Sequence, residues 1–251
     1  MVRAGAPTAE RLIGPADFWR SEGRMAAGPV LAIDTSTKIG GVALYQGDRV
    51  LGEETWLAGG LQTAQILPAA ARLWERAGLA PRDLALIVVA TGPGSFTGLR
   101  VGVSLAKGLC CALGVPLIGV PTLDAVAYQH RDGAARLWVV ASAGRGLLYA
   151  GQYRRWQGRL RREGDYLVVT PEELGQRLAK ARTGSLVAGE LERAEVEAIL
   201  ERADRARVVA PAGALRRAAY LAELGLWSFA ERGPDDAAAL QPLYLRRGPR
   251  E

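Results

Sequence analysis

A glycine-rich run constrains the fold of this chain more than any other part of its sequence. It reads Thr91-Gly92-Pro93-Gly94-Ser95-Phe96-Thr97-Gly98-Leu99-Arg100 and lies between an apolar strand pattern at 86–90 and an apolar helix pattern at about 99–113. Glycines allow a tight turn or the close approach of another backbone, and Thr97 is the expected N-cap of the helix. The run predicts either an anion site at a helix N-terminus or a structural strand-to-helix turn. It matches neither of the common phosphate-loop motifs.

Composition limits what the chain can do. Its 251 residues allow one large or two small domains, and charged residues interrupt the 49% that are hydrophobic, so we expect no window that could span a bilayer. Residues 1–28 lack the apolar core of a signal peptide, which favours a cytoplasmic location. The single histidine, His130, cannot form a two-histidine metal site and is expected at a solvated helix end. The formal charge of +6 permits contact with a polyanion.

The order of the apolar patterns predicts an α/β protein with a mixed sheet. Strands are expected at 30–34, 42–46 and 49–56 as a meander, then a helix ending at Ala77, the strand and helix around the glycine-rich run, a strand at 115–120 and a short helix capped by Thr122. A strand-turn-strand pattern at 137–153 repeats the opening of the chain. Strands at 166–169 and 185–189, helices at 171–181, 192–202 and 214–232, and a tail that packs back at 240–247 complete the prediction. The predicted organisation is an extension at 1–28, a first lobe at 29–130 and a second lobe at 131–251.

Arginines cluster in the predicted hairpin at 153–160. Arg154, Arg155, Arg159, Arg161 and Arg162 surround Trp156. Contact between these side chains and phosphates would make nucleic-acid binding depend on salt concentration, whereas the alternative is an ordinary solvated turn.

Four motifs together resemble the bacterial TsaB family of tRNA threonylcarbamoyladenosine biosynthesis proteins. They are the strand-Asp-Thr-Ser at 33–36, Gln65-Ile66-Leu67-Pro68, the glycine-rich run to Arg100, and Tyr244-Leu245-Arg246 near the end. The resemblance is dense from about 30 to 124 and thin through the second half. It implies an actin-like, sugar-kinase-like (ASKHA) fold of two ribonuclease-H-like lobes with mixed sheets covered by helices, which agrees with the repeated meander.

The resemblance also implies a function. Members of this family act beside a catalytic relative, TsaD, and an ATPase, TsaE, which place a threonylcarbamoyl group from threonylcarbamoyl-AMP on the adenosine next to the anticodon of tRNAs that read codons beginning with A. The family is regarded as non-catalytic, so we expect no catalytic residue, no metal and no required cofactor, with ATP or ADP at the complex interface as an option. The expected partners are TsaD, TsaE and, through the complex, tRNA. A homodimer of the chain alone is a further option, and no membrane contact is expected.

Two departures from the family pattern bear on the site. Gln62 stands where many relatives have histidine, and Ser142-Ala143-Gly144-Arg145-Gly146-Leu147-Leu148-Tyr149 replaces a stretch that carries an acid and an arginine in relatives. The alternative function is a stand-alone ATP-dependent phosphotransferase of the same fold, which would need the Asp34 turn and a phosphate turn at Gly144-Arg145-Gly146.

The candidate site residues fall into two groups. Small and apolar side chains on two helices would let a partner helix approach closely, although ordinary packing on the parent sheet explains the same spacing. The partner-interface candidates are Gln62, Gln65, Ile66, Gly98, Leu99, Gly102, Val103 and Ala106. The nucleotide or phosphate candidates are Asp34, Thr35, Ser36, Gly94 and Ser95.

Overall fold

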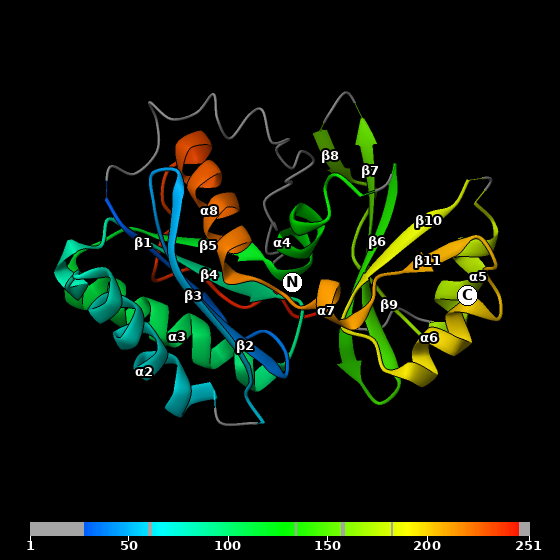
Figure 1. Cartoon of the computed structure of the whole chain (residues 1–251), viewed down its shortest axis with the longest axis horizontal. Helices are drawn as coiled ribbons and strands as arrows, with labels where there is room; N and C mark the ends of the chain where they lie inside the picture. The colour runs from blue at the N-terminus through cyan, green and yellow to red at the C-terminus, as the bar shows by residue number, and fades with distance from the viewer. Residues whose placement is uncertain (1–27, 60–61, 134, 157–158, 182, 246–251) are drawn as a thin grey trace.

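In the part of the chain that the structure describes, the strands form two sheets that lie side by side, each covered by helices (Figure 1). The computed structural model describes residues 28–59, 62–133, 135–156, 159–181 and 183–245. The predicted extension lies outside these residues, apart from Gly28.

The first sheet has the strand order β3-β2-β1-β4-β5. β1 pairs antiparallel with β2 and parallel with β4, which in turn pairs parallel with β5. The central strand β1 is fully buried, as its run of Val, Leu, Ala and Ile predicts for a strand covered on both faces. The strands are β1 (Val30–Asp34), β2 (Ile39–Gln46), β3 (Arg49–Leu57), β4 (Leu86–Gly92) and β5 (Leu117–Pro121).

Helices cover both faces of the first sheet (Figure 1). On one face lie α2 (Gln62–Ala77), which contains Pro68, and α3 (Phe96–Leu113), with the short 3-10 turn η2 (Pro81–Asp83) between α2 and β4. On the other face lies α8 (Ala218–Arg232), which contacts β1, β2, β4 and β5. One apolar core lies under α2 and α3, and a second extends from α8 through α4 into the other lobe.

The second sheet repeats this arrangement. Its strand order is β11-β10-β6-β7-β8, with the short β9 paired to β7. The strands are β6 (Arg136–Gly144), β7 (Leu147–Trp156), β8 (Arg159–Arg162), β9 (Leu167–Val169), β10 (Ser185–Gly189) and β11 (Ala206–Val208). The helices are α4 (Thr122–Gln129), α5 (Pro171–Ala179), α6 (Arg193–Leu200) and α7 (Pro211–Ala214).

The two sheets therefore share one topology. In each, a three-strand antiparallel meander is followed by two parallel strands on the other side of the first strand. This confirms the prediction of an actin-like fold with two ribonuclease-H-like lobes. The lobes do not follow the predicted boundary throughout, because α8 comes from the C-terminal part of the chain but packs on the first sheet.

Several predicted details were wrong. Helix α3 begins at Phe96, and its N-cap is Ser95, whose Oγ accepts a hydrogen bond from the Gly98 amide at 3.3 Å. Thr122 is the first residue of α4 and not its cap; its Oγ1 accepts from the Gly92 amide at 3.1 Å. The sequence patterns also missed β11.

Helix α3 corrects the expectation of no membrane-spanning window. Its 18 residues have a mean hydropathy of 1.3, and it is the one helix in the described part of the chain that is long and apolar enough to cross a bilayer. Arg100 and Lys107 interrupt it, which is why the sequence showed no continuous apolar run. The inner side of α3 packs against β4, so one helix of this kind is weak evidence for a membrane.

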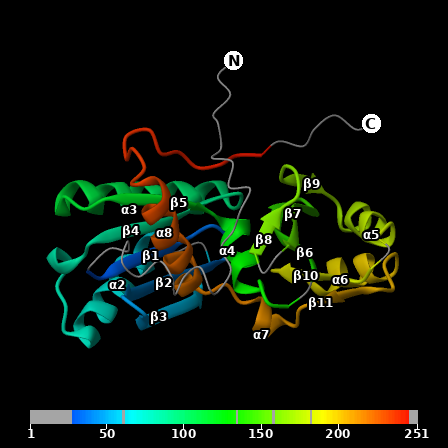
Figure 2. The same cartoon turned by 90° about the horizontal axis from the view of Figure 1, so that it is seen from above.

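The C-terminal segment packs back on the body, as predicted for 240–245; residues 246 and 247 lie outside the described part. Figure 2 shows it, in red, running from the first lobe towards the second. The Leu243 amide donates to the Thr91 carbonyl at 2.7 Å, and the Tyr244 and Phe96 rings lie 5.0 Å apart.

Candidate functional site

The glycine-rich run is pressed against the turn that follows β1. The Ser95 amide donates to the Ser36 carbonyl at 2.6 Å, and the Thr35 Oγ1 donates to the Gly98 carbonyl at 2.7 Å. A Cβ on Gly94 would lie 2.1 Å from the Ser36 carbonyl oxygen, and a Cβ on Gly98 would lie equally close to that of Thr35. Only glycine fits at these positions. Of the two interpretations of the run, the geometry favours the structural turn.

Asp34 is held by partners within the chain. Its Oδ1 accepts hydrogen bonds from the Ser36 amide at 2.9 Å and the Ser36 Oγ at 2.5 Å. Its Oδ2 accepts from the Arg216 Nε at 2.9 Å. The side chain is almost completely buried. The phosphate function predicted for the group around Asp34 stays a prediction, and this arrangement leaves neither carboxylate oxygen without a partner.

Arg216 joins the two lobes. It lies between α7 and α8, is 6% exposed, and binds the ends of strands from both sheets. Its Nη1 donates to Glu190 after β10 at 2.5 Å and to the Thr37 Oγ1 at 2.7 Å, while its Nη2 donates to the Ile39 carbonyl at 2.9 Å. Burial alone would lower the pKa of Arg216, but the neighbouring Asp34 and Glu190 carboxylates outweigh it and raise that pKa. We call Arg216, Asp34, Glu190 and Thr37 the arginine clamp.

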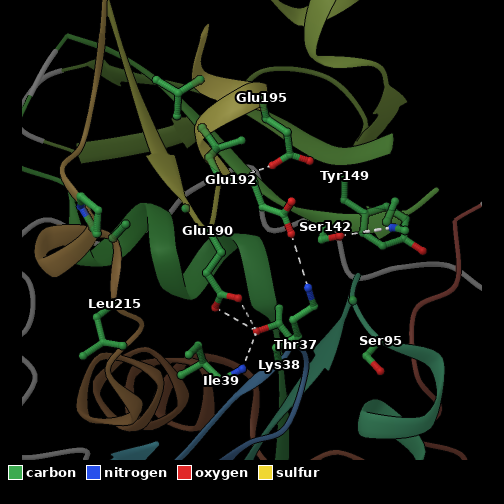
Figure 3. Close-up of a pocket in the computed structure, with 18 of the residues that line it drawn as sticks. Thr37, Lys38, Ile39, Ser95, Ser142, Tyr149, Glu190, Glu192, Glu195 and Leu215 are labelled. Carbon is green, nitrogen blue, oxygen red and sulfur yellow. Dashed lines mark hydrogen bonds and ion pairs between the residues drawn. The ribbon is translucent and has the colours of Figure 1, made fainter. Parts of the chain in front are cut away.

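A cavity of about 850 Å³ lies between the lobes, and Thr37 and Glu190 of the clamp are part of its lining (Figure 3). The Glu190 carboxylate turns toward Thr37, and Lys38 reaches across to Glu192 at 3.5 Å. Glu195 also lines the cavity, so that three carboxylates do in all. Much of the remaining lining is apolar or aromatic: Ile39, Phe96, Tyr149, Leu191, Val196, Val208, Val209, Pro211, Ala214, Leu215, Tyr244 and Leu245.

The charged lining of this cavity consists of three carboxylates and one lysine, and two of the carboxylates are paired, Glu190 with Arg216 and Glu192 with Lys38. Nucleotide binding at this cavity stays a prediction. The second predicted phosphate turn, at Gly144-Arg145-Gly146, connects β6 to β7, and of its residues Gly144 lines the cavity. Among the described residues, no group of three or more His, Cys, Asp or Glu side chains could hold a metal ion.

Most predicted interface residues lie inside the first lobe. Ile66, Leu99, Val103 and Ala106 are at most 3% exposed and belong to the packing of α2 and α3 on the sheet. Gly98 and Gly102 are also buried, and a Cβ on Gly102 would lie 2.2 Å from the Thr35 Oγ1. The stripe of small residues is therefore used for packing within the chain, which was the alternative interpretation.

The remaining two interface candidates differ. Gln65 is half-buried, and its Oε1 accepts a hydrogen bond from the Trp56 Nε1 at 2.8 Å. Gln62 is the first residue of α2, and its side chain lies outside the described part.

The outer side of α3 remains open. Only 28% of this apolar helix is buried within the protein. Val101 and Leu105 are half-buried, Gly108 and Ala112 are exposed, and the space where a Gly108 side chain would stand has no atom within 4 Å. The neighbouring helix α2 adds Leu67, which is 42% exposed. We call this surface the α2–α3 face; Figure 1 shows the two helices that carry it.

His130 was wrongly predicted as a solvated residue. It follows α4 as its C-cap and is half-buried, and its Nε2 is buried without a partner among the described residues. Burial lowers its pKa, since the charged imidazolium loses hydration.

Arg216 is the residue that sequence reasoning missed. It stands beside Arg217 in an ordinary-looking Leu-Arg-Arg stretch, and no local pattern separates the two. Its importance comes from Asp34 and Glu190, which lie 182 and 26 residues away in the chain.

Comparison with known proteins agrees with this architecture. A family model described as TsaD, tRNA N6-adenosine threonylcarbamoyltransferase, matches residues 60–199, more than half of the chain. The protein named tRNA threonylcarbamoyladenosine biosynthesis protein TsaB from Bacillus subtilis is 38% identical over 131 residues, which is 52% of this chain and 57% of that protein. The protein of the same name from Escherichia coli is 33% identical over 156 residues, 59% of this chain and 65% of that protein. These alignments span less than two thirds of either relative.

A solved structure described as YeaZ from Pseudomonas aeruginosa has a TM-score of 0.73 and 28% sequence identity to this chain. The superposition covers 87% of this chain and 100% of that one. Together with the family model, the curated relatives and the duplicated topology, this likeness shows that the chain belongs to the TsaB family.

Proposed function

We propose that this chain is a non-catalytic subunit that binds TsaD and, with TsaE, supports the transfer of threonylcarbamoyl to adenosine in tRNA. The observation that carries the proposal is the α2–α3 face, where the outer side of the apolar helix α3 consists of half-buried and exposed residues and α2 adds the exposed Leu67. Contiguous exposed apolar surface is typical of a protein interface. Because Gly108 has no side chain, the backbone of a partner helix could approach α3 closely there.

The clamp supports the absence of chemistry in this subunit. Asp34 is the acid that the phosphotransferase alternative would need, and its carboxylate is engaged by Arg216 and Ser36. A metallopeptidase would be hard to build with one histidine in the whole sequence. We infer that TsaD provides the catalytic groups and that this chain acts as a non-catalytic binding partner. ATP or ADP at the interface of the complex stays a prediction.

The α2–α3 face can be tested with Gly108→Arg. Gly108 is exposed within a helix, so arginine there should be at least as compatible with the fold as glycine. The variant should keep its melting temperature but lose co-purification with TsaD of the same organism. Ala179→Arg, at an exposed position of α5 in the other lobe, is the matched control and should bind normally.

Two results would contradict the proposal. If Gly108→Arg still binds TsaD, the docking surface lies elsewhere. If the purified wild-type chain alone modifies tRNA or hydrolyses ATP, the subunit is catalytic.

Size-exclusion chromatography would detect a homodimer that the free chain forms through the same face, because Gly108→Arg would convert that dimer to a monomer.

A further inference from the structure

The strands β6, β7 and β8 carry a concentration of arginine. Residues 133–162 contain seven arginines and no acidic residue. The register of the sheet places three of them directly opposite one another, because Arg136 pairs with Arg154 and Arg154 pairs with Arg161. We call Arg136, Arg154 and Arg161 the arginine row.

The row lies on one face of the second sheet. Alternate residues of a strand point to the same face of the sheet. Arg136 therefore points to the same face as Trp138 and Val140, which pack toward α5 and α6. Arg161 lies on the side opposite to Leu160, whose side chain enters the core between the lobes. None of the three arginines is fully buried. In Figure 1, β7 and β8 form the upper end of the second lobe, away from the α2–α3 face.

Little negative charge balances the row. Among the described residues, Glu163 is the acid paired with it: its Oε1 lies 2.6 Å from the Arg154 Nε, and its Oε2 also accepts from Gln152 at 2.7 Å. Like charges placed directly opposite each other on neighbouring strands destabilise a sheet. Arginine stays protonated at any physiological pH and cannot relieve the repulsion by losing a proton. Stability of the fold therefore does not explain the row.

The opposite face of the same strands holds the row in place. The Tyr153 and Tyr166 hydroxyls donate to the buried Asp124 Oδ1 at 2.7 and 2.6 Å. The Arg162 guanidinium stacks 4.2 Å from the Tyr166 ring and lies 3.8 Å from Asp124. These contacts fasten β7 and β8 to α4, so the arginines are presented by a rigid sheet.

We propose that the arginine row binds the phosphate backbone of RNA. Guanidinium groups match phosphate oxygens in a two-pronged geometry, and neighbouring strands space them about 4.8 Å apart. A negatively charged backbone passing over the row removes the repulsion that the isolated sheet carries. The proposal rests on the proposed function, which makes tRNA the RNA in question, and it adds a direct contact from the second lobe. An acidic protein segment is the competing occupant, and the test below separates the two.

The test uses the full chain and unmodified tRNA over a series of salt concentrations. Arg136→Gln/Arg161→Gln removes two charges from the row and leaves the Arg154–Glu163 pair intact. Arg82→Gln/Arg207→Gln removes two exposed arginines elsewhere and is the charge-matched control. The row variant should bind about tenfold more weakly at low salt. The slope of log affinity against log salt should fall by about 1 to 2, since each phosphate contact contributes about 0.7 to 0.9.

The control variant should keep most of the affinity and most of the slope. The row variant should also be at least as stable as the wild type, because it loses repulsive charge. Three results would overturn the proposal: no tRNA binding by the wild-type chain at low salt, equal losses in both variants, or binding of polyglutamate in place of tRNA with loss of that binding in the row variant.

Failure of this proposal can be told from failure of the proposed function. The row is distant from the α2–α3 face, so the row variant should still co-purify with TsaD. If the row variant binds TsaD and keeps its tRNA affinity, only the proposed RNA contact is contradicted. If the wild-type chain binds tRNA but does not bind TsaD, only the proposed docking to TsaD is contradicted.

Discussion

Both sheets begin with the same strand-turn-strand unit, but the turn in the first sheet is buried and the turn in the second is exposed. After β1, Thr35 and Ser36 are fully buried beneath the glycine-rich run. After β6, Arg145 is exposed, and the spaces beside Gly144 and Gly146 have no atom within 4 Å. Parts of both units line the cavity between the lobes.

The difference shows that residues far away in the chain decide what such a turn does. The first turn is closed by α3 and by Arg216, neither of which belongs to its own meander. No comparable contact reaches the described residues of the second turn. The first turn therefore helps to connect the two lobes, while the second turn stays exposed.

The strongest test of this contrast removes the clamp. Arg216→Met should lower the free energy of unfolding by about 3–5 kcal/mol, because it leaves the buried Asp34 carboxylate and Glu190 without their counter-charge. Arg217→Met is the matched control next to it. Arg217 is 49% exposed and paired with Glu53, so its loss should cost only about 0–1 kcal/mol.

Chemical denaturation of both variants measures the difference. If the two losses are equal, Arg216 does not join the lobes as the geometry indicates, and the first turn is as independent as the second.

A second test acts on the contact between α3 and the first turn. Alanine for glycine inside a helix normally stabilises it, so Gly108→Ala should gain about 0.5–1 kcal/mol. Gly98→Ala should do the reverse and lose about 1–3 kcal/mol, because its Cβ would overlap the Thr35 carbonyl oxygen. The sign of the change in denaturation midpoint separates the two positions. A gain at Gly98 would mean that the turn is not held by close packing.

Sequence reasoning captured the parts of the fold that are local. The β-branched strand at 86–90 and the meander from Val30 were recognisable because buried strands are continuous runs of apolar residues. Gly114 was recognised as the end of α3, and it adopts the left-handed conformation expected there.

The rest depended on contacts between distant segments. Whether Gly98 and Gly102 face a partner or their own sheet cannot be read from spacing alone, since both uses need small residues at the same positions. Likewise, Arg216 and Arg217 look alike in the sequence, and only the fold buries one and exposes the other. The sequence therefore predicted which motifs form the site, but not which distant residues contact them.

The smallest test concerns the free turn between β6 and β7. Arg145 has φ of 54°, in the left-handed region that asparagine and glycine tolerate best in a two-residue hairpin. Arg145→Asn should therefore raise the free energy of unfolding by about 0.5–1 kcal/mol. Lys38→Asn in the first turn, where the backbone has no positive φ, should bring no gain. The two variants are compared by their denaturation midpoints, provided that the dependence of the unfolding free energy on denaturant concentration is the same in both. An unchanged Arg145→Asn midpoint would mean that the arginine side chain stabilises its own turn, and the second turn would then be less free than its exposure suggests.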